Sequence, residues 1–345
     1  MKKIIRYVAA ALVVGLAFVS CKTSVEQGDE NLVCEMVNVM NSQATVTGAD
    51  TTFLDSSAEN REKGVFITGR NVTLSPFSMG KYLVTQDLYR TYMEGESVNG
   101  TPLNSDPSDC KETGDWPLAD GEIQGERPVD EVSWLDAVYF CNVLTEKTLG
   151  ASKKVYTITD ITVTDGHITE AVVTQDLTKT GYRLPTEAEW EFAARGGDPS
   201  QPDWNYAYSG HAASQNLSDD LHDDSCIDSV GWYYNNTLTG NTADGGTSRG
   251  EPGRGSHQVG KKAPNRLGIY DMTGNVSEWC YDRWADSVEL GNVTDPIGPS
   301  SGSDHVIRGG SFSNHAIGCS VCWRDYWVPD EGDDFIGFRL ARSIR

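Results

Sequence analysis

The chain has 345 residues, with 50 acidic and 28 basic side chains and a net charge of −22 at pH 7. This acidic balance argues against nucleic acid or an anionic lipid surface as the partner, because phosphate groups would be repelled. It suits solubility and the binding of cations. The length exceeds that of an average domain, but we find no internal repeat and expect one large domain with insertions.

The N-terminus has the layout of an export signal. Lys2, Lys3 and Arg6 precede an uncharged run of 13 residues, 7–19, which is too short to span a bilayer but suits a signal-peptide core. The run ends in small residues before Cys21, as in a bacterial lipobox. We therefore predict that Cys21 is lipidated and begins the mature protein. An ordinary signal peptide followed by an incidental cysteine is the alternative.

These features divide the chain into three predicted parts. Residues 1–20 form the signal peptide, residues 21–33 form a lipidated tether poor in apolar side chains, and residues 34–345 form a single domain. Removing the signal takes the net charge from −22 to −25, because its three charged residues are all basic. We expect an exported protein that is anchored to the cell envelope through lipid and faces the outer surface.

Capping residues and hydrophobic spacing indicate three helices. Thr85 and Ser133 each precede a run with apolar side chains at helical spacing. Thr186 followed by Glu189 forms the capping-box pattern at the start of the third helix. The predicted helices are 86–93, 134–146 and 187–195.

Strands are harder to find, since long regular periodicity is scarce and glycine is abundant at 35 residues. Asp165-Gly166 separates two alternating runs, which is a strong hairpin signal, and we predict an insertion hairpin at about 153–178. Residues 197–258 are expected to be irregular. The composition predicts a loop-rich α+β fold. The predicted strands are 65–67, 72–74, 156–163 and 167–173.

Several ordered sequence blocks resemble the formylglycine-generating-enzyme (sulfatase-modifying-factor) family. The most recognisable is Arg-Leu-Pro-Thr-Glu-Ala-Glu-Trp-Glu at 183–191. The resemblance implies a C-type-lectin-like α+β domain that is loop-rich, with few helices and short strands. Function does not follow from the fold, because sites are grafted onto folds. The blocks are 78–85, 126–134, 183–191, 264–279, 308–311 and 336–342.

The catalytic cysteine pair of that family is incomplete in this chain. The resemblance implies copper between two cysteines five residues apart, and the matching positions here are Asn314 and Cys319. A neutral amide cannot replace a thiolate as a ligand for Cu(I), and Cys322 would need a different local geometry. We therefore expect Cys319 to be a buried thiol or a disulfide partner of Cys280, and no enzymatic activity. A formylglycine-generating copper oxidase that uses Cys319, or an inactive relative of it, is the alternative.

Seven cysteines remain once Cys21 is assigned to the lipid. Export permits disulfides, and an odd count leaves at least one free thiol.

Calcium is the metal that the resemblance favours, as a structural ion. Carboxylates and backbone carbonyls supply the hard oxygens that calcium prefers. The alternative is that these residues only cap and hydrogen-bond loops. The first site implied comprises Asp271, Glu278 and the carbonyls of Gly274 and Val276, and a weaker second site comprises Asn216, the Leu217 carbonyl and Asp228.

The C-terminal stretch 308–342 mixes aromatic and small polar residues between fixed anchors, with no period of 2 or 3.6. It therefore does not predict a helix or strand with one buried face. Rigid aromatics among adaptable polar residues are typical of binding surfaces. The candidate ligand-binding residues are Ser313, Asn314, His315, Ile317, Gly318, Trp323, Asp325, Tyr326, Trp327, Val328, Asp333, Asp334 and Phe335.

This layout resembles the C-terminal variable region of retroelement-diversified lipoproteins, the Treponema variable proteins. The resemblance implies a surface-displayed protein that binds an extracellular protein or another surface ligand through a diversified region. In the alternative, the protein is a drifted, inactive enzyme relative whose aromatic residues belong to the core. A structural component of the envelope is a third hypothesis.

Overall fold

The computed structural model describes residues 34–54, 58–218, 223–237 and 252–345. The predicted signal peptide, Cys21 and the tether lie outside these residues. Contacts group Leu32–Arg345 into one compact unit. Within the described ranges, no helix has the length and apolar character needed to cross a bilayer.

The three α-helices confirm the predicted ones and begin at the predicted caps. Thr85 accepts a hydrogen bond from the Leu88 amide, and Ser133 accepts one from the Asp136 amide. Thr186 and Glu189 form a reciprocal capping box. The second helix runs three residues beyond its predicted end, up to Gly150 at φ 93°, where a left-handed residue ends it. The helices are α1 Gln86–Met93, α2 Trp134–Leu149 and α3 Glu187–Ala194.

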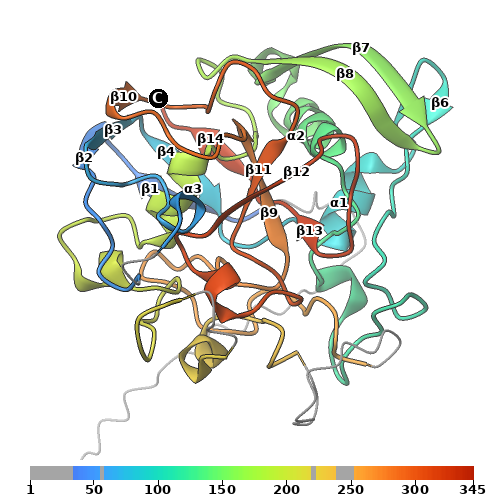
Figure 1. The fold of residues 1–345 in the computed structure, drawn as a ribbon. Helices are drawn as coiled ribbons and strands as arrows, with labels where there is room; N and C mark the ends of the chain where they lie inside the picture. The colour runs from blue at the N-terminus through green and yellow to red at the C-terminus, as the bar shows by residue number, and fades with distance from the viewer. Residues whose placement is uncertain (1–33, 55–57, 219–222, 238–251) are drawn as a thin grey trace, which may run out of the picture. The chain divides into compact units, whose positions relative to one another are not determined.

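In the described part of the chain, short strands form five small sheets, and most strands pair with partners distant in the sequence (Figure 1). A four-stranded sheet has the order β12-β11-β9-β13, and two three-stranded sheets have the orders β1-β4-β14 and β10-β3-β2. The strands are β1 Met36–Met40, β2 Ala44–Thr47, β3 Arg70–Leu74, β4 Phe77–Gly80, β5 Ser97–Val98, β6 Thr101–Pro102, β7 Tyr156–Thr164, β8 His167–Gln175, β9 Ser277–Arg283, β10 Gly291–Thr294, β11 His305–Arg308, β12 Arg324–Trp327, β13 Ile336–Gly337 and β14 Ala341–Ser343.

Single turns of 3₁₀-helix occur in the loops. The irregular character expected for residues 197–258 holds in the described part of that range, where two of these turns are the only helical elements. The 3₁₀ turns are η1 Asn60–Glu62, η2 Gln124–Glu126, η3 Ala151–Lys153, η4 Pro202–Asn205, η5 Ser225–Ser229 and η6 Ala316–Cys319.

The predicted hairpin is present as β7 and β8, drawn in green beside α2 in Figure 1. Asp165 and Gly166 both have positive φ, 51° and 86°, as a two-residue turn of the primed type requires. The hairpin is fixed to α2 by Asp136, whose carboxylate accepts from the Ile168 amide and lies 2.9 Å from His167 Nδ1.

Two strand predictions were wrong. Residues 65–67 form bends, because side chains rather than another strand take the backbone groups of Val65. Its amide donates to Glu191 and its carbonyl accepts from Arg70. Conversely, Arg324–Trp327 forms β12 although the sequence has no strand-like alternation, because its backbone pairs with β11.

Buried ion pairs connect α3 to the rest of the domain. Arg308 donates to Glu191, whose other oxygen accepts from Arg195, and both arginines are almost fully buried. The carboxylates in the 183–191 block therefore have structural partners, and the block is conspicuous in the sequence because it builds the centre of the fold. The other pairs of this kind are Arg183 with Glu189, Arg324 with Glu187 and Arg339 with Glu278.

Candidate functional site

The turn that follows β11 holds the position of the family's catalytic pair. Ser311 donates to Asn314 Oδ1 twice, from its amide at 2.9 Å and from its hydroxyl at 2.8 Å. The Asn314 side chain thus closes the turn that leads into η6. Cys319 is buried and its thiol donates to the Ser311 carbonyl, 3.7 Å away. Asn314 and Cys319 do not fit the two-thiolate copper site that the resemblance implies.

Burial holds the nearby thiols in their neutral form. It raises the pKa of both Cys319 and Cys322 to about 12, and Arg195 donates to the Cys322 sulfur at 3.1 Å. All seven cysteines in the described part of the chain are free thiols. Of the two states expected for Cys319, the structure has the buried thiol and not the disulfide with Cys280.

The first candidate calcium site is built around Asp271, an acidic residue with positive φ. Asp271 is buried at φ 57°; its Oδ2 accepts from the Gly260 amide, and its Oδ1 is buried without a hydrogen-bond partner. Burial raises the pKa of this carboxyl to about 6. By contrast, Glu278 already accepts from Arg339 and from the Trp190 indole. Asp271 therefore has an oxygen to spare, whereas Glu278 would share its oxygens with Arg339.

No group of three or more His, Cys, Asp or Glu side chains within the described ranges could hold a metal ion. A calcium ion would therefore depend on backbone carbonyls, such as those of Gly274 and Val276. At the weaker site, Asn216 and Asp228 are exposed, Leu217 is buried, and Asp228 Oδ1 accepts from Asn236.

β12 distributes the C-terminal aromatic residues over two surfaces. Side chains alternate along a strand, so Arg324 and Tyr326 share one face and Asp325 and Trp327 share the other. The two faces lead to different neighbours, described in turn below.

The first surface is an aromatic groove of about 550 Å³. Tyr326, 45% exposed, lies over Trp284 with ring centroids 4.9 Å apart, and Arg324 lies against Trp284 at 4.8 Å. At the same edge, the Arg61 guanidinium lies 4.6 Å from the Trp323 ring. Rigid rings and exposed polar groups thus meet on one surface. The groove is lined by Ala58, Glu59, Asn60, Arg61, Trp284, Asp286 and Tyr326.

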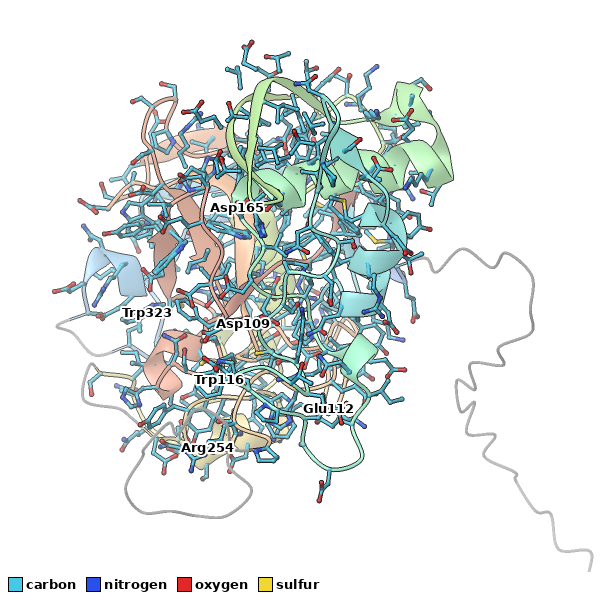
Figure 2. All side chains as sticks on the ribbon, turned by 90° about the vertical axis from the view of Figure 1, so that its right-hand side faces the viewer. Asp109, Glu112, Trp116, Asp165, Arg254 and Trp323 are labelled. Carbon is cyan, nitrogen blue, oxygen red and sulfur yellow. The ribbon has the colours of Figure 1, made fainter. Side chains whose placement is uncertain are left out.

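The second surface contains a more buried aromatic cluster. The Trp327 and Phe335 rings pack edge to face at 5.6 Å. Trp116, labelled in Figure 2 together with Trp323, donates to Asp334 at 2.6 Å and packs against Phe312 at 5.2 Å. This cluster holds the loop after β12 against the loop around residue 116.

The candidate ligand-binding residues differ in exposure. Ser313, Tyr326 and Val328 are exposed, whereas Ile317, Gly318 and Asp334 are buried. The rest are intermediate in exposure: Asn314, His315, Trp323, Asp325, Trp327, Asp333 and Phe335.

Sequence reasoning missed Trp284, Arg61 and Trp116. Each stands in a loop or a single turn without periodicity, so no spacing marks it as a neighbour of the C-terminal stretch. Trp284 follows β9 directly, and the pairing of β9 with β11 carries it to this surface.

The arrangement of short mixed sheets and three helices is that of a loop-rich, C-type-lectin-like α+β domain. The Sulfatase-modifying factor enzyme 1-like domain matches residues 23–344, and the chain belongs to that family.

Two relatives show the range of the family. A chaperone protein, LppX, from Paenibacillus barcinonensis is 32% identical over 318 residues, covering 87% of this chain and 91% of that protein. The formylglycine-generating enzyme of Thermomonospora curvata is 34% identical over 170 residues, covering 47% of this chain and 49% of the enzyme. The match to that enzyme thus spans about half of its length.

Solved structures give the same fold. Treponema denticola variable protein 1 has a TM-score of 0.59 at 28% identity, covering 88% of this chain and 95% of that chain. CarF has a TM-score of 0.58 at 26% identity, covering 91% of this chain and 99% of that chain. The likeness to the first of these confirms the suspected resemblance to a Treponema variable protein at the level of the fold.

Proposed function

We propose that this chain is a lipid-anchored envelope protein, displayed on the outer surface, that binds a protein ligand through its C-terminal stretch and has no sulfatase-modifying activity. The observation that carries the proposal is the contact of Tyr326 with Trp284. An exposed tyrosine held against a tryptophan offers a large contact area without a further loss of rotamer freedom.

The composition of the groove supports a protein ligand. Trp, Tyr and Arg are the residue types most enriched among those that dominate binding energy at protein interfaces. The groove brings Trp284, Tyr326 and Arg61 together, with Glu59 and Asp286 at its margin. LppX, the similar protein, is named a chaperone, a role that requires contact with another protein.

The turn after β11 supports the absence of family catalysis. Asn314 uses its carbonyl oxygen to hold Ser311, and the Cys319 thiol is buried and neutral. An isolated neutral thiol lacks both the charge and the second sulfur that a Cu(I) site needs.

Structural calcium at Asp271 is part of the proposal. The unpartnered Oδ1 supports it, since a hard cation would supply the missing interaction. Glu278 has the least capacity to bind the calcium ion, because its carboxylate is already neutralised by Arg339.

The first experiment is to sequence the DNA downstream of the gene. A near-copy of the codons for residues 308–342, differing mainly at template adenines and followed by a reverse-transcriptase gene, is the expected result. Absence of both removes the basis for diversification, and an inactive enzyme relative then becomes the better description.

A second experiment tests the enzyme alternative with the full-length protein in detergent. Copper(I) and a sulfatase-derived cysteine peptide are supplied in air, and the peptide mass is followed. We expect no conversion of cysteine to formylglycine. Conversion that disappears in Cys319→Ser would establish the enzyme instead.

A further inference from the structure

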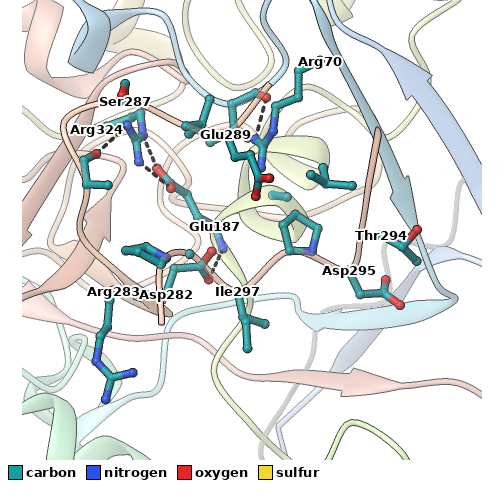
Figure 3. A pocket seen from close by; sticks show the side chains of 18 residues that line it. Arg70, Glu187, Asp282, Arg283, Ser287, Glu289, Thr294, Asp295, Ile297 and Arg324 are labelled. Atoms are coloured by element: carbon teal, nitrogen blue, oxygen red, sulfur yellow. Dashed lines mark hydrogen bonds and ion pairs between the residues drawn. The ribbon is translucent and has the colours of Figure 1, made fainter. Parts of the chain in front are cut away.

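A separate cavity of about 540 Å³ lies where the start of α3 meets β3 and the loop that follows β9 (Figure 3). Its volume is in the range of small-molecule sites. Its buried polar side chains come from four elements that are far apart in the sequence. Arg70 stands on β3, Glu187 begins α3, and Asp282 and Arg324 stand on β9 and β12.

Arg70 is buried in this cavity without a carboxylate partner. It is 5% exposed, and within the described residues its side chain makes one hydrogen bond, from Nη1 to the Val65 carbonyl at 2.9 Å. Its Nε is buried without a partner, and no ion pair to Arg70 occurs in the described part of the chain. Buried charges in proteins are normally paired, because desolvating an unpaired charge costs several kcal/mol. Burial accordingly lowers the pKa of the Arg70 guanidinium.

The two buried carboxylates of the cavity, Glu187 and Asp282, do not supply an ion-pair partner for Arg70. Glu187 accepts two hydrogen bonds from Arg324, at 2.6 and 2.9 Å. Asp282 accepts from the Glu187 amide at 2.8 Å, and burial next to Glu187 raises the pKa of its carboxyl well above the usual range. Neither carboxylate therefore forms an ion pair with Arg70.

The remaining lining is mixed. Its polar members are Arg283, Ser287, Glu289, Thr294 and Asp295; Glu289 is exposed, and Asp295 accepts from the Ser75 amide and hydroxyl, each at 2.7 Å. Apolar side chains come from β10, from the start of α3 and from the loop after β10, and they face the cavity around the polar groups. They suit a short hydrocarbon body attached to a charged group. The apolar lining residues are Val65, Ala188, Ala285, Val288, Val293, Pro296, Ile297 and Pro299.

We propose that this cavity is a binding site for a small organic anion, a carboxylate or a phosphate ester on a short aliphatic body. The anionic group pairs with Arg70 and accepts from its unpartnered Nε, and the hydrocarbon lies along the aliphatic part of the lining. The site is independent of the aromatic groove, and Glu187 with Arg324 forms its already neutralised inner wall.

The test is titration calorimetry on the full-length protein in detergent, with hexanoate and hexyl phosphate as probes. The two probes share the body and distinguish the carboxylate from the phosphate source. We expect at least one to bind, and binding to weaken at least tenfold in Arg70→Met. Arg90→Met is the matched control, since Arg90 is an exposed helix arginine that does not line the cavity, and this variant should bind as the unchanged protein does.

A second variant does not depend on how the core tolerates a change at Arg70. Ile297 is 44% exposed and lines the cavity, so Ile297→Glu should fold normally and weaken binding by placing a negative charge there. Failure of both probes to bind the unchanged protein overturns the proposal. So does equal binding to the unchanged protein and to folded Ile297→Glu.

Discussion

Arg308 Nη2 donates to Glu191 Oε2 at 2.7 Å, and both side chains are fully buried. The contact ties the strand before the Ser311 turn to α3, 117 residues earlier in the chain. Arg308 also donates to the Val321 carbonyl at 2.9 Å, so one guanidinium fixes both ends of the loop that carries η6.

Removing one partner of this pair should be costly. Arg308→Met leaves the buried Glu191 with Arg195 alone, and breaking a buried pair costs about 3–5 kcal/mol. Urea unfolding followed by tryptophan fluorescence measures the change. Arg266→Met, at a 44% exposed arginine, is the control and should change the free energy of unfolding by less than about 1 kcal/mol. Equal losses in both variants would contradict the structural role assigned to Arg308.

The cap of α3 gives a smaller, local effect. Thr186→Ala removes the hydroxyl that accepts from the Glu189 amide, and the expected loss is about 1 kcal/mol of unfolding free energy. Thr186→Ser keeps the acceptor and should recover most of it. If serine and alanine behave alike in the same urea titration, the hydroxyl is not the stabilising group.

Glycine at 274 is required by space as well as by backbone angle. A Cβ at this position would lie 1.9 Å from the Trp232 carbonyl oxygen, whereas one at Gly100 meets nothing within 4 Å. Both residues have positive φ, 70° and 85°. Gly100→Ala therefore reports the backbone cost alone, about 1–2 kcal/mol. Gly274→Ala should lose clearly more stability than Gly100→Ala in thermal unfolding. Equal losses would mean that the loop around Trp232 moves aside at no cost.

His305 should make stability depend on pH. It is buried against Trp134 at 3.8 Å, and burial lowers its pKa from 6.5 to about 4. Between pH 4 and 6.5, His305 is protonated in the unfolded chain and neutral in the folded chain. Its contribution to the free energy of unfolding is therefore complete above pH 6.5 and is lost as the pH falls toward 4. The loss is on the order of 3 kcal/mol.

Other buried groups titrate in the same pH range, so the effect of His305 is measured as the difference between the unchanged protein and a variant. His305→Asn cannot be protonated, and its unfolding free energy should fall less steeply from pH 6.5 to 4 than that of the unchanged protein. Parallel curves for the two proteins would show that His305 is protonated in the folded state.

The aromatic groove predicts separate effects on binding and stability. Tyr326→Ala removes an exposed ring and should change the free energy of unfolding by less than about 0.5 kcal/mol. If Tyr326 is a central contact, affinity for the protein ligand should fall by more than about 1 kcal/mol, measured by surface plasmon resonance. Val172→Ala, at a position 54% exposed on β8 and outside the candidate ligand-binding residues, is the control. Affinity unchanged in both Tyr326→Ala and Trp323→Ala would count against the groove.

Local signals predicted the helices well, because Thr85, Ser133 and Thr186 each mark a helix start through a bond to a residue three positions on. The hairpin at Asp165-Gly166 was predictable for the same reason. Strands such as β9 and β13 were missed for two reasons. They pair with each other across 59 residues of sequence, and they are buried on both faces, so their side chains do not alternate between apolar and polar. Long-range pairing has no local signature.

The candidate site was predictable only where it lies within one segment. Residues 308–342 were identified by their composition, but β12 separates Tyr326 from Trp327, and Trp284 and Arg61 join from elsewhere. The cavity around Arg70 had no sequence signal, because Arg70, Glu187 and Asp282 meet only through the tertiary fold.

β12 ends the order of its sheet and is held to β11 through main-chain pairing at four positions. Such hydrogen bonds are the same whatever side chain a residue carries. Within this strand, Arg324 is the member whose side chain also anchors the core. Changes at Asp325 and Tyr326 would therefore alter the outer surface while leaving the pairing of the strand intact, whereas a change at Trp327 would also disturb its packing against Phe335. The edge of this sheet thus tolerates variation at its exposed positions.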